Sequence, residues 1–146
     1  MNQAILEFVK RKLRGEGFKL TTPRLAIIEY LVSVSDHPDV QQIYNGMRTE
    51  HPGIGIATIY RTVDLLERIG LLRVLKLESG HLRYEIVRPG DHHHHLICTG
   101  CGQVCEFGDC SFQMIAAAIE KKTCFKIRGH NLEAYGLCPR CDALTG

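Results

Sequence analysis

The stretch Asp91–Cys105 reads D-H-H-H-H-L-I-C-T-G-C-G-Q-V-C and places four consecutive histidines just before a C-x-x-C pair. A second C-x-x-C pair, Cys138–Cys141, follows near the C-terminus, and all seven cysteines of the chain lie after residue 97. Neutral imidazoles and thiolates are the ligands that zinc and similar divalent metals prefer. The stretch therefore predicts that the second half of the chain is organised around metal ions.

The two C-x-x-C pairs predict a structural zinc site. A tight turn aims both sulfurs of a pair at one ion, and four thiolates close a tetrahedral zinc site without an open position. The expected ligands are Cys98, Cys101, Cys138 and Cys141. The alternatives are a redox-active pair or inert buried thiols, although a redox motif needs a single pair in a βαβ context. The remaining cysteines lack a spaced partner and are interpreted as small core residues: Cys105, Cys110 and Cys124.

The histidine run predicts ligands on two faces of a strand. Successive side chains of a strand point to opposite faces, so His93 and His95 share one face while His92 and His94 share the other. Further ligands for the first face are available before and after it in the sequence, at His37, Glu85 and Glu106. A metal that draws ligands from both halves of the chain would fix the angle between them, which is the requirement for a metal-operated switch.

Composition predicts two domains, 1–88 and 89–146. The first holds 13 basic and 10 acidic side chains, a net charge of +3, and the second holds 5 and 6, a net charge of −1. A polyanion partner is therefore expected at the first domain. The apolar runs are short and broken by charge, so no membrane span is expected. The charged residues within the first 14 positions argue against a signal peptide and predict a cytoplasmic protein.

The first domain has the pattern of a winged helix-turn-helix. Apolar periodicity predicts helices over about 3–14, 21–33, 39–51 and 57–69, and alternation over 72–86 predicts a hairpin with a turn at 78–81. The fourth helix would enter a major groove and offer Thr58, Tyr60 and Arg61 to DNA. The alternative is a small α+β core without a nucleic-acid partner. The second domain, a strand pair, a helix over 111–122 and extended chain over 125–137, predicts a compact β-α-β module.

Together these motifs resemble the ferric uptake regulator family of metal-responsive bacterial repressors. The matching stretches are Leu20-Thr-Thr-Pro-Arg24, His37-Pro38, Ile43-Tyr44, Ala57-Thr-Ile-Tyr-Arg61, Tyr84-Glu85, His93-x-His95-Leu-Ile-Cys98-x-x-Cys101-Gly102, Glu106-Phe107 and His130-x4-Tyr135-Gly136-x-Cys138-x-x-Cys141. The resemblance implies an α+β chain with an N-terminal winged helix-turn-helix domain and a small α/β dimerisation domain. It also implies a homodimeric repressor that binds AT-rich palindromic operators in double-stranded DNA when it is loaded with metal.

The resemblance also implies roles for individual residues. The regulatory metal would be held by His37, Glu85, His93, His95 and Glu106, and a possible second site corresponds to His92, His94, Gln113 and His130. The family commonly has acidic residues at the positions of His94 and Gln113, and a neutral amide is a poor ligand for these metals. Lys19 is placed to enter a minor groove and Arg24 to hold a phosphate.

The identity of the regulatory metal is predicted from two positions. The peroxide-sensing branch of the family typically has Asp where this chain has Glu106, and the zinc-sensing branch often has Cys near Glu85. These residues favour Fe(II) sensing, with Mn(II) or Zn(II) as alternatives, and a peroxide, zinc, manganese or nickel sensor stays open. A zinc hydrolase is disfavoured because no H-E-x-x-H helix is present, so no enzymatic activity is expected. A metal-storage module would not need the winged helix.

Overall fold

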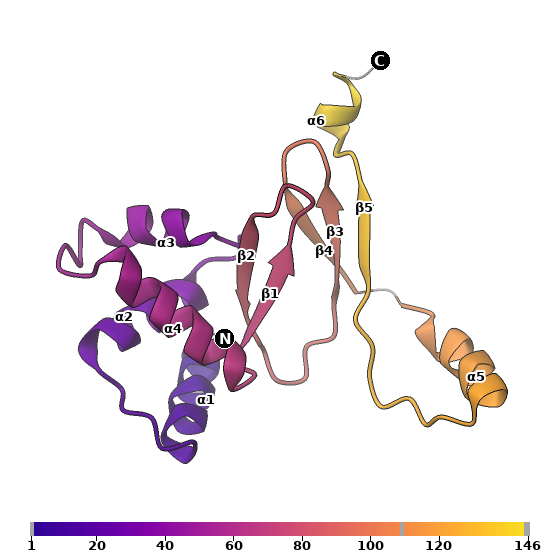
Figure 1. Cartoon of the computed structure of the whole chain (residues 1–146), viewed down its shortest axis with the longest axis horizontal. Helices are drawn as coiled ribbons and strands as arrows, with labels where there is room; N and C mark the ends of the chain where they lie inside the picture. Colours follow the sequence, from indigo (N-terminus) through magenta and orange to yellow (C-terminus); the bar gives the residue numbers. More distant parts are fainter. Residues whose placement is uncertain (1, 109, 145–146) are drawn as a thin grey trace. The chain divides into compact units, whose positions relative to one another are not determined.

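The computed structural model describes residues 2–108 and 110–144 and divides into two compact units, Met1–Asp91 and His92–Gly146 (Figure 1). The sequence placed the boundary after residue 88, whereas the structure assigns Pro89, Gly90 and Asp91 to the first unit. Among the described residues, no helix combines the length and the apolar character needed to cross a membrane.

The first unit consists of four helices followed by a two-stranded hairpin. Its elements are α1 (Asn2–Gly15), α2 (Thr22–Ser33), α3 (Val40–Met47), α4 (Ile56–Arg68), β1 (Leu72–Lys76) and β2 (Leu82–Ile86). The helices pack on one another through apolar side chains that the 3.6-residue period places on their inner faces. Val9, Leu13, Ile28, Ile43 and Ile59 have essentially no exposed surface. The helix-turn-helix and the wing predicted from the sequence are both present.

Local sequence signals set the starts of the helices. Thr21 caps α2, because its hydroxyl accepts a hydrogen bond of 3.4 Å from the backbone N–H of Arg24, and Pro23 occupies the first turn. Asp39 and Gln42 form a capping box at α3, in which each side chain accepts a hydrogen bond from the backbone N–H of the other. Gly70 follows α4 with a left-handed φ of 72°, where a glycine is favoured.

The hairpin is joined to the turn that precedes α3. Strands β1 and β2 are antiparallel, and Arg73 lies opposite Glu85 in the register. The backbone N–H of Tyr84 donates a hydrogen bond of 3.0 Å to the carbonyl of Pro38. This bond places β2 beside His37, although the two segments lie far apart in the sequence.

The second unit is a three-stranded sheet in the order β4-β3-β5 with two helices. Its elements are β3 (His94–Cys98), β4 (Val104–Phe107), α5 (Phe112–Thr123), β5 (Glu133–Gly136) and α6 (Pro139–Asp142). Strand β3 is antiparallel to β4 and parallel to β5. The first strand was expected from His92 and begins at His94, and the extended stretch expected over 125–137 is a strand only over Glu133–Gly136. Residues 124–132 form a loop. The side chain of Glu120 on α5 accepts a hydrogen bond of 2.7 Å from the backbone N–H of Ile127 in this loop.

The second unit has few buried apolar side chains. Among its described residues, the buried side chains are those of His93, His94, His95, Ile97 and Cys98. Helix α5 has no buried residue, and Met114 on it is 78% exposed. A unit of this size with so small a core needs stabilisation from bound metal or from a partner chain.

Candidate metal centres and DNA-binding face

The four cysteines of the two C-x-x-C pairs converge in the second unit. One sulfur from each of the four residues lies within 4.8 Å of the others. The sulfurs of Cys101 and Cys138 are 3.8 Å apart. A tetrahedral zinc with four Zn–S bonds of about 2.3 Å requires S···S separations of about 3.8 Å. The sulfur cluster therefore fits a closed, structural zinc site.

Backbone contacts between the turn after β3 and the end of β5 bring the two C-x-x-C pairs together. Thr99 donates a backbone hydrogen bond of 2.8 Å to the carbonyl of Gly136, which fixes the turn after β3 against the end of β5. A Cβ atom at Gly100 would lie 3.0 Å from both Cβ and Sγ of Cys141, so the close approach depends on the missing side chain. Gly102 adopts a left-handed φ of 72° and closes the first turn.

Hydrogen bonds shift the pKa values of three of these thiols in different directions. The pKa of Cys98 is lowered to about 6 by hydrogen bonds from the backbone of Cys138 and Cys101. The pKa of Cys101 is lowered by a hydrogen bond from the backbone of Gln103. The pKa of Cys141 is raised to about 12 by hydrogen bonds with the side chains of Cys138 and Cys101. A bound zinc ion would displace the proton from Cys141, since zinc binds thiolates.

The histidines alternate between the two faces of β3, as the sequence predicted. The rings of His93 and His95 have centroids 5.0 Å apart, and those of His92 and His94 have centroids 4.7 Å apart. His95 is fully buried and pairs across the sheet with Glu106 on β4. One ligand atom of His95 and one of Glu106 lie within 4.8 Å of each other. The second unit thus presents imidazoles and a carboxylate on one side of β3.

The first unit presents an imidazole and a carboxylate of its own. His37 and Glu85 are both buried, and one ligand atom of each lies within 4.8 Å of the other. Arg73 forms an ion pair of 3.1 Å with Glu85, and Arg83 donates a hydrogen bond of 3.5 Å to the carbonyl of His37. The pair is therefore held in place by the wing, and its donor set of nitrogen and oxygen suits a divalent metal.

The second face of β3 carries a different group of ligands. One ligand atom from each of four residues lies within 4.8 Å of the others, and these are His92, His94, Cys110 and His130. Burial and the neighbouring imidazoles of His92 and His130 lower the pKa of His94, which favours the neutral ring. Gln113 lies on α5 and is exposed. Cys110 was interpreted from the sequence as a small core residue, because a cysteine without a spaced partner carries no metal motif, and in the structure it is half-buried.

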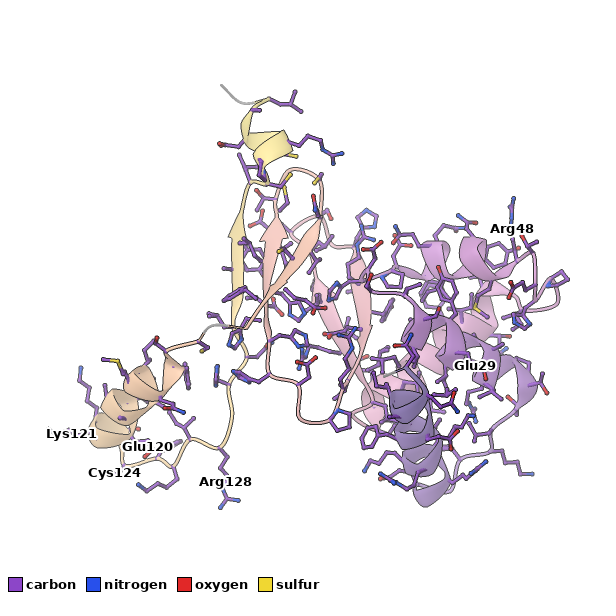
Figure 2. All side chains as sticks on the ribbon, turned by 180° about the vertical axis from the view of Figure 1, so that it is seen from behind. Glu29, Arg48, Glu120, Lys121, Cys124 and Arg128 are labelled. Carbon is purple, nitrogen blue, oxygen red and sulfur yellow. The ribbon has the colours of Figure 1, made fainter. Side chains whose placement is uncertain are left out.

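The other two unassigned cysteines are on the surface of the single chain. Cys105 and Cys124 are exposed, so their interpretation as core residues is wrong for the single chain. Cys124 ends α5 with a left-handed φ of 59°, beside Glu120 and Lys121 (Figure 2).

The outer face of α4 presents the side chains that were predicted to contact DNA. Tyr60 is 50% exposed and Arg61 is exposed, whereas Thr58 is half-buried. The guanidinium of Arg61 donates a hydrogen bond of 3.3 Å to the hydroxyl of Thr58. The inner face of the helix is anchored by Ile59, Val63 and Leu66, which have no exposed surface. These anchors fix the direction in which Tyr60 and Arg61 project.

Lys19 lies in the loop before α2 and is exposed. The guanidinium of Arg24 donates a hydrogen bond to the carbonyl of Lys19. Arg24 is half-buried and therefore also supports the loop, in addition to the phosphate contact predicted for it.

Comparisons with known proteins place the chain in a family. The model of the ferric uptake regulator family matches residues 15–135. The chain belongs to the ferric uptake regulator family. The ferric uptake regulation protein of Synechococcus elongatus is 35% identical over 136 residues, which is 92% of each chain. The structure of the Helicobacter pylori ferric uptake regulator matches with a TM-score of 0.82 and 26% identity, and covers 97% of this chain and 94% of the other.

A zinc-bound manganese uptake regulator also matches, with a TM-score of 0.69 and 33% identity over 89% of this chain and 98% of the other. Ferric uptake regulators are metal-responsive transcription factors that bind DNA and act as dimers, and they are not enzymes. Their fold, a winged helix-turn-helix domain followed by a dimerisation domain, is the fold predicted from the sequence. The fold and the family resemblance are thus confirmed.

Proposed function

We propose that the chain is an Fe(II)-responsive repressor whose regulatory metal takes ligands from both units. The set is the one expected from the sequence: His37, Glu85, His93, His95 and Glu106. The observation that carries the proposal is that each unit presents ligands of its own: His37 and Glu85 are buried in the first, and buried His95 lies beside the exposed Glu106 in the second. Imidazole and carboxylate side chains gathered in this way are ligands that divalent metals prefer.

The chemistry of the ligands supports iron. Three imidazoles with two carboxylates form a nitrogen and oxygen set that suits Fe(II), Mn(II) and Zn(II). Glu106, where the peroxide-sensing branch typically has Asp, favours iron sensing without peroxide chemistry. The names of the relatives point the same way, since the Synechococcus elongatus and Bacillus subtilis proteins are ferric uptake regulation proteins.

Manganese is the second candidate for the regulatory metal. The manganese uptake regulator is 33% identical to this chain. A structural zinc held by the four cysteines would be present in either case, since a closed sulfur site suits zinc.

The proposed DNA target is the AT-rich palindromic operator that the family resemblance implies. Tyr60 and Arg61 on α4 would read an AT-rich palindromic operator, with Thr58 and Arg24 at phosphates and Lys19 in an adjacent minor groove. Two copies of α4 in a homodimer match the two halves of a palindrome. The protein would act in the cytoplasm, where bacterial DNA lies.

The test is DNA binding by the zinc-loaded full-length protein, measured by fluorescence anisotropy on an AT-rich palindrome. Fe(II) under anaerobic conditions, Mn(II) and Zn(II) are titrated, and a chelator is then added. We expect Fe(II) to tighten binding at the lowest free concentration and His93→Ala to abolish this response while one zinc per chain is retained. Equal affinity with and without metal would refute the switch, and a response to Mn(II) alone would move the assignment to manganese.

A further inference from the structure

A cluster of three histidines and one cysteine lies on the side of β3 opposite His93 and His95. We call it the histidine–cysteine cluster, and it consists of His92, His94, Cys110 and His130. Its members come from the start of β3, the residue before the N-cap of α5 and the loop that follows α5. All four belong to the second unit.

His94 is the member of the cluster that most needs a partner. Its side chain has no exposed surface, and neither ring nitrogen has a hydrogen-bond partner among the described residues. A buried imidazole without hydrogen-bond partners at its ring nitrogens destabilises the fold. The rings of His92 and His130 lie 4.7 Å and 5.0 Å from it, centroid to centroid, and do not satisfy either nitrogen. A metal ion would satisfy one of them.

The ligand atoms of the cluster lie close enough together to bind one metal ion. The sulfur of Cys110 lies 3.2 Å from Nε2 of His130. Zinc bonds of about 2.0–2.1 Å to nitrogen and about 2.3 Å to sulfur imply N···S separations of about 3.5 Å. A simple thiol–imidazole hydrogen bond would account for this pair, but it would leave the convergence of His92 and His94 on the same point unexplained.

The aromatic neighbours orient the rings. Phe112 stacks on His130 at 3.8 Å between centroids with planes 16° apart, and Phe107 lies 5.4 Å from His94. Packing of this kind fixes the orientation of a ligand ring before the metal arrives.

We propose that Cys110, and not the exposed Gln113, is the fourth ligand of the second metal site that the family resemblance implies, and that its thiolate makes this site prefer zinc. Its donor set of three nitrogens and one thiolate is softer than the regulatory set with its two carboxylates. Thiolate and imidazole favour zinc, whereas carboxylates suit iron and manganese. The two faces of β3 would therefore prefer different metals: zinc on the side of the histidine–cysteine cluster, and iron or manganese on the side of His93 and His95.

The site also explains how α5 is attached. Cys110 lies just before α5 and His130 lies in the loop after it, while α5 itself has no buried residue. An ion held by both residues and by His94 ties the two ends of α5 to β3. Zinc occupancy thus orders the helix whose exposed apolar side chains, Met114 and Ile115, are available to a partner chain.

The test uses the full-length protein with its structural zinc in place and weakly held metal removed by a chelator. Co(II) is titrated as a spectroscopic probe, and a thiolate-to-cobalt charge-transfer band in the near ultraviolet is expected. The regulatory ligands contain no sulfur, so this band reports Cys110 alone as long as one zinc per chain is retained. We expect Zn(II) to displace the cobalt and Mn(II) to leave the band unchanged.

Three variants decide the assignment. Cys110→Ser is expected to lose the band and to weaken zinc binding at this site by more than about 100-fold, beyond what loss of an outer-shell partner costs. Cys124→Ser, which removes an exposed cysteine outside the cluster, and Gln113→Ala are expected to behave like the wild type. A band that persists in Cys110→Ser, or its absence from the wild type, would overturn the proposal.

Alkylation provides a readout that does not depend on a variant. Zinc is expected to protect Cys110 from N-ethylmaleimide, while Cys124 reacts at the same rate with and without zinc. Peptide mass spectrometry measures both rates in one sample. Equal labelling of Cys110 in both states would also overturn the proposal.

Discussion

Replacement of Asp39 by alanine is expected to destabilise the first unit by about 1–2 kcal/mol. The Asp39 carboxylate accepts a hydrogen bond of 2.7 Å from the backbone N–H of Gln42 and lies 3.8 Å from the guanidinium of Arg83. Loss of an N-cap costs about 1 kcal/mol, and a partly exposed ion pair contributes about 0.2–1 kcal/mol. Asp39→Asn is the matched control, because it keeps the cap and removes only the charge, so its cost should stay below about 1 kcal/mol.

Urea unfolding of the zinc-loaded protein measures the two variants. Far-ultraviolet circular dichroism follows the first unit, since four helices dominate its signal. If Asp39→Asn lowered the free energy of unfolding as much as Asp39→Ala, the N-cap hydrogen bond would not be the source of the stabilisation. If neither variant lowered the free energy of unfolding, the capping box would have no energetic role.

The same substitution should also weaken the metal response. Asp39 follows the turn of His37 and Pro38, which β2 holds through Tyr84 and Arg83. Without the cap, metal binding must also order the turn that carries His37. If this costs about 1 kcal/mol, the free metal concentration needed for half-maximal DNA binding rises about 5-fold. Unchanged metal dependence in a destabilised variant would separate the cap from the ligand pair.

Two further predictions concern the DNA contact and the structural zinc. Lys19→Ala should weaken operator binding and lower the slope of log affinity against log salt by about one, as measured by anisotropy at several salt concentrations; an unchanged slope excludes a phosphate or groove contact. Removal of the zinc with a strong chelator, or the substitution Cys98→Ser, should unfold the second unit, because its apolar core is too small without the ion. A native circular dichroism spectrum after complete loss of zinc would contradict this.

Much of the fold was predictable because its signals are local. The caps at Thr21 and Asp39 and the apolar period of α4 depend on residues a few positions apart. The alternation of His92 to His95 follows from the two-residue period of a strand. The paired C-x-x-C spacing indicated a common metal, since each pair is itself a local motif.

The predictions were weaker where the signal depends on contacts distant in the sequence. The extended stretch expected over 125–137 is largely a loop, because only Glu133–Gly136 finds a partner strand in β3. Strand pairing of this kind is decided by tertiary contacts more than by propensity.

The sequence by itself predicted the winged helix-turn-helix and the candidate metal ligands, because apolar periodicity and repeated spacing encode them directly, and its motifs carried the resemblance to the family. Only the tertiary structure placed Cys110 beside His130, and left Gln113 exposed on α5. The physical reason is that a lone thiol acquires ligand chemistry from the groups that surround it in space. Those groups come from a strand start and a loop that the chain brings together only when it folds.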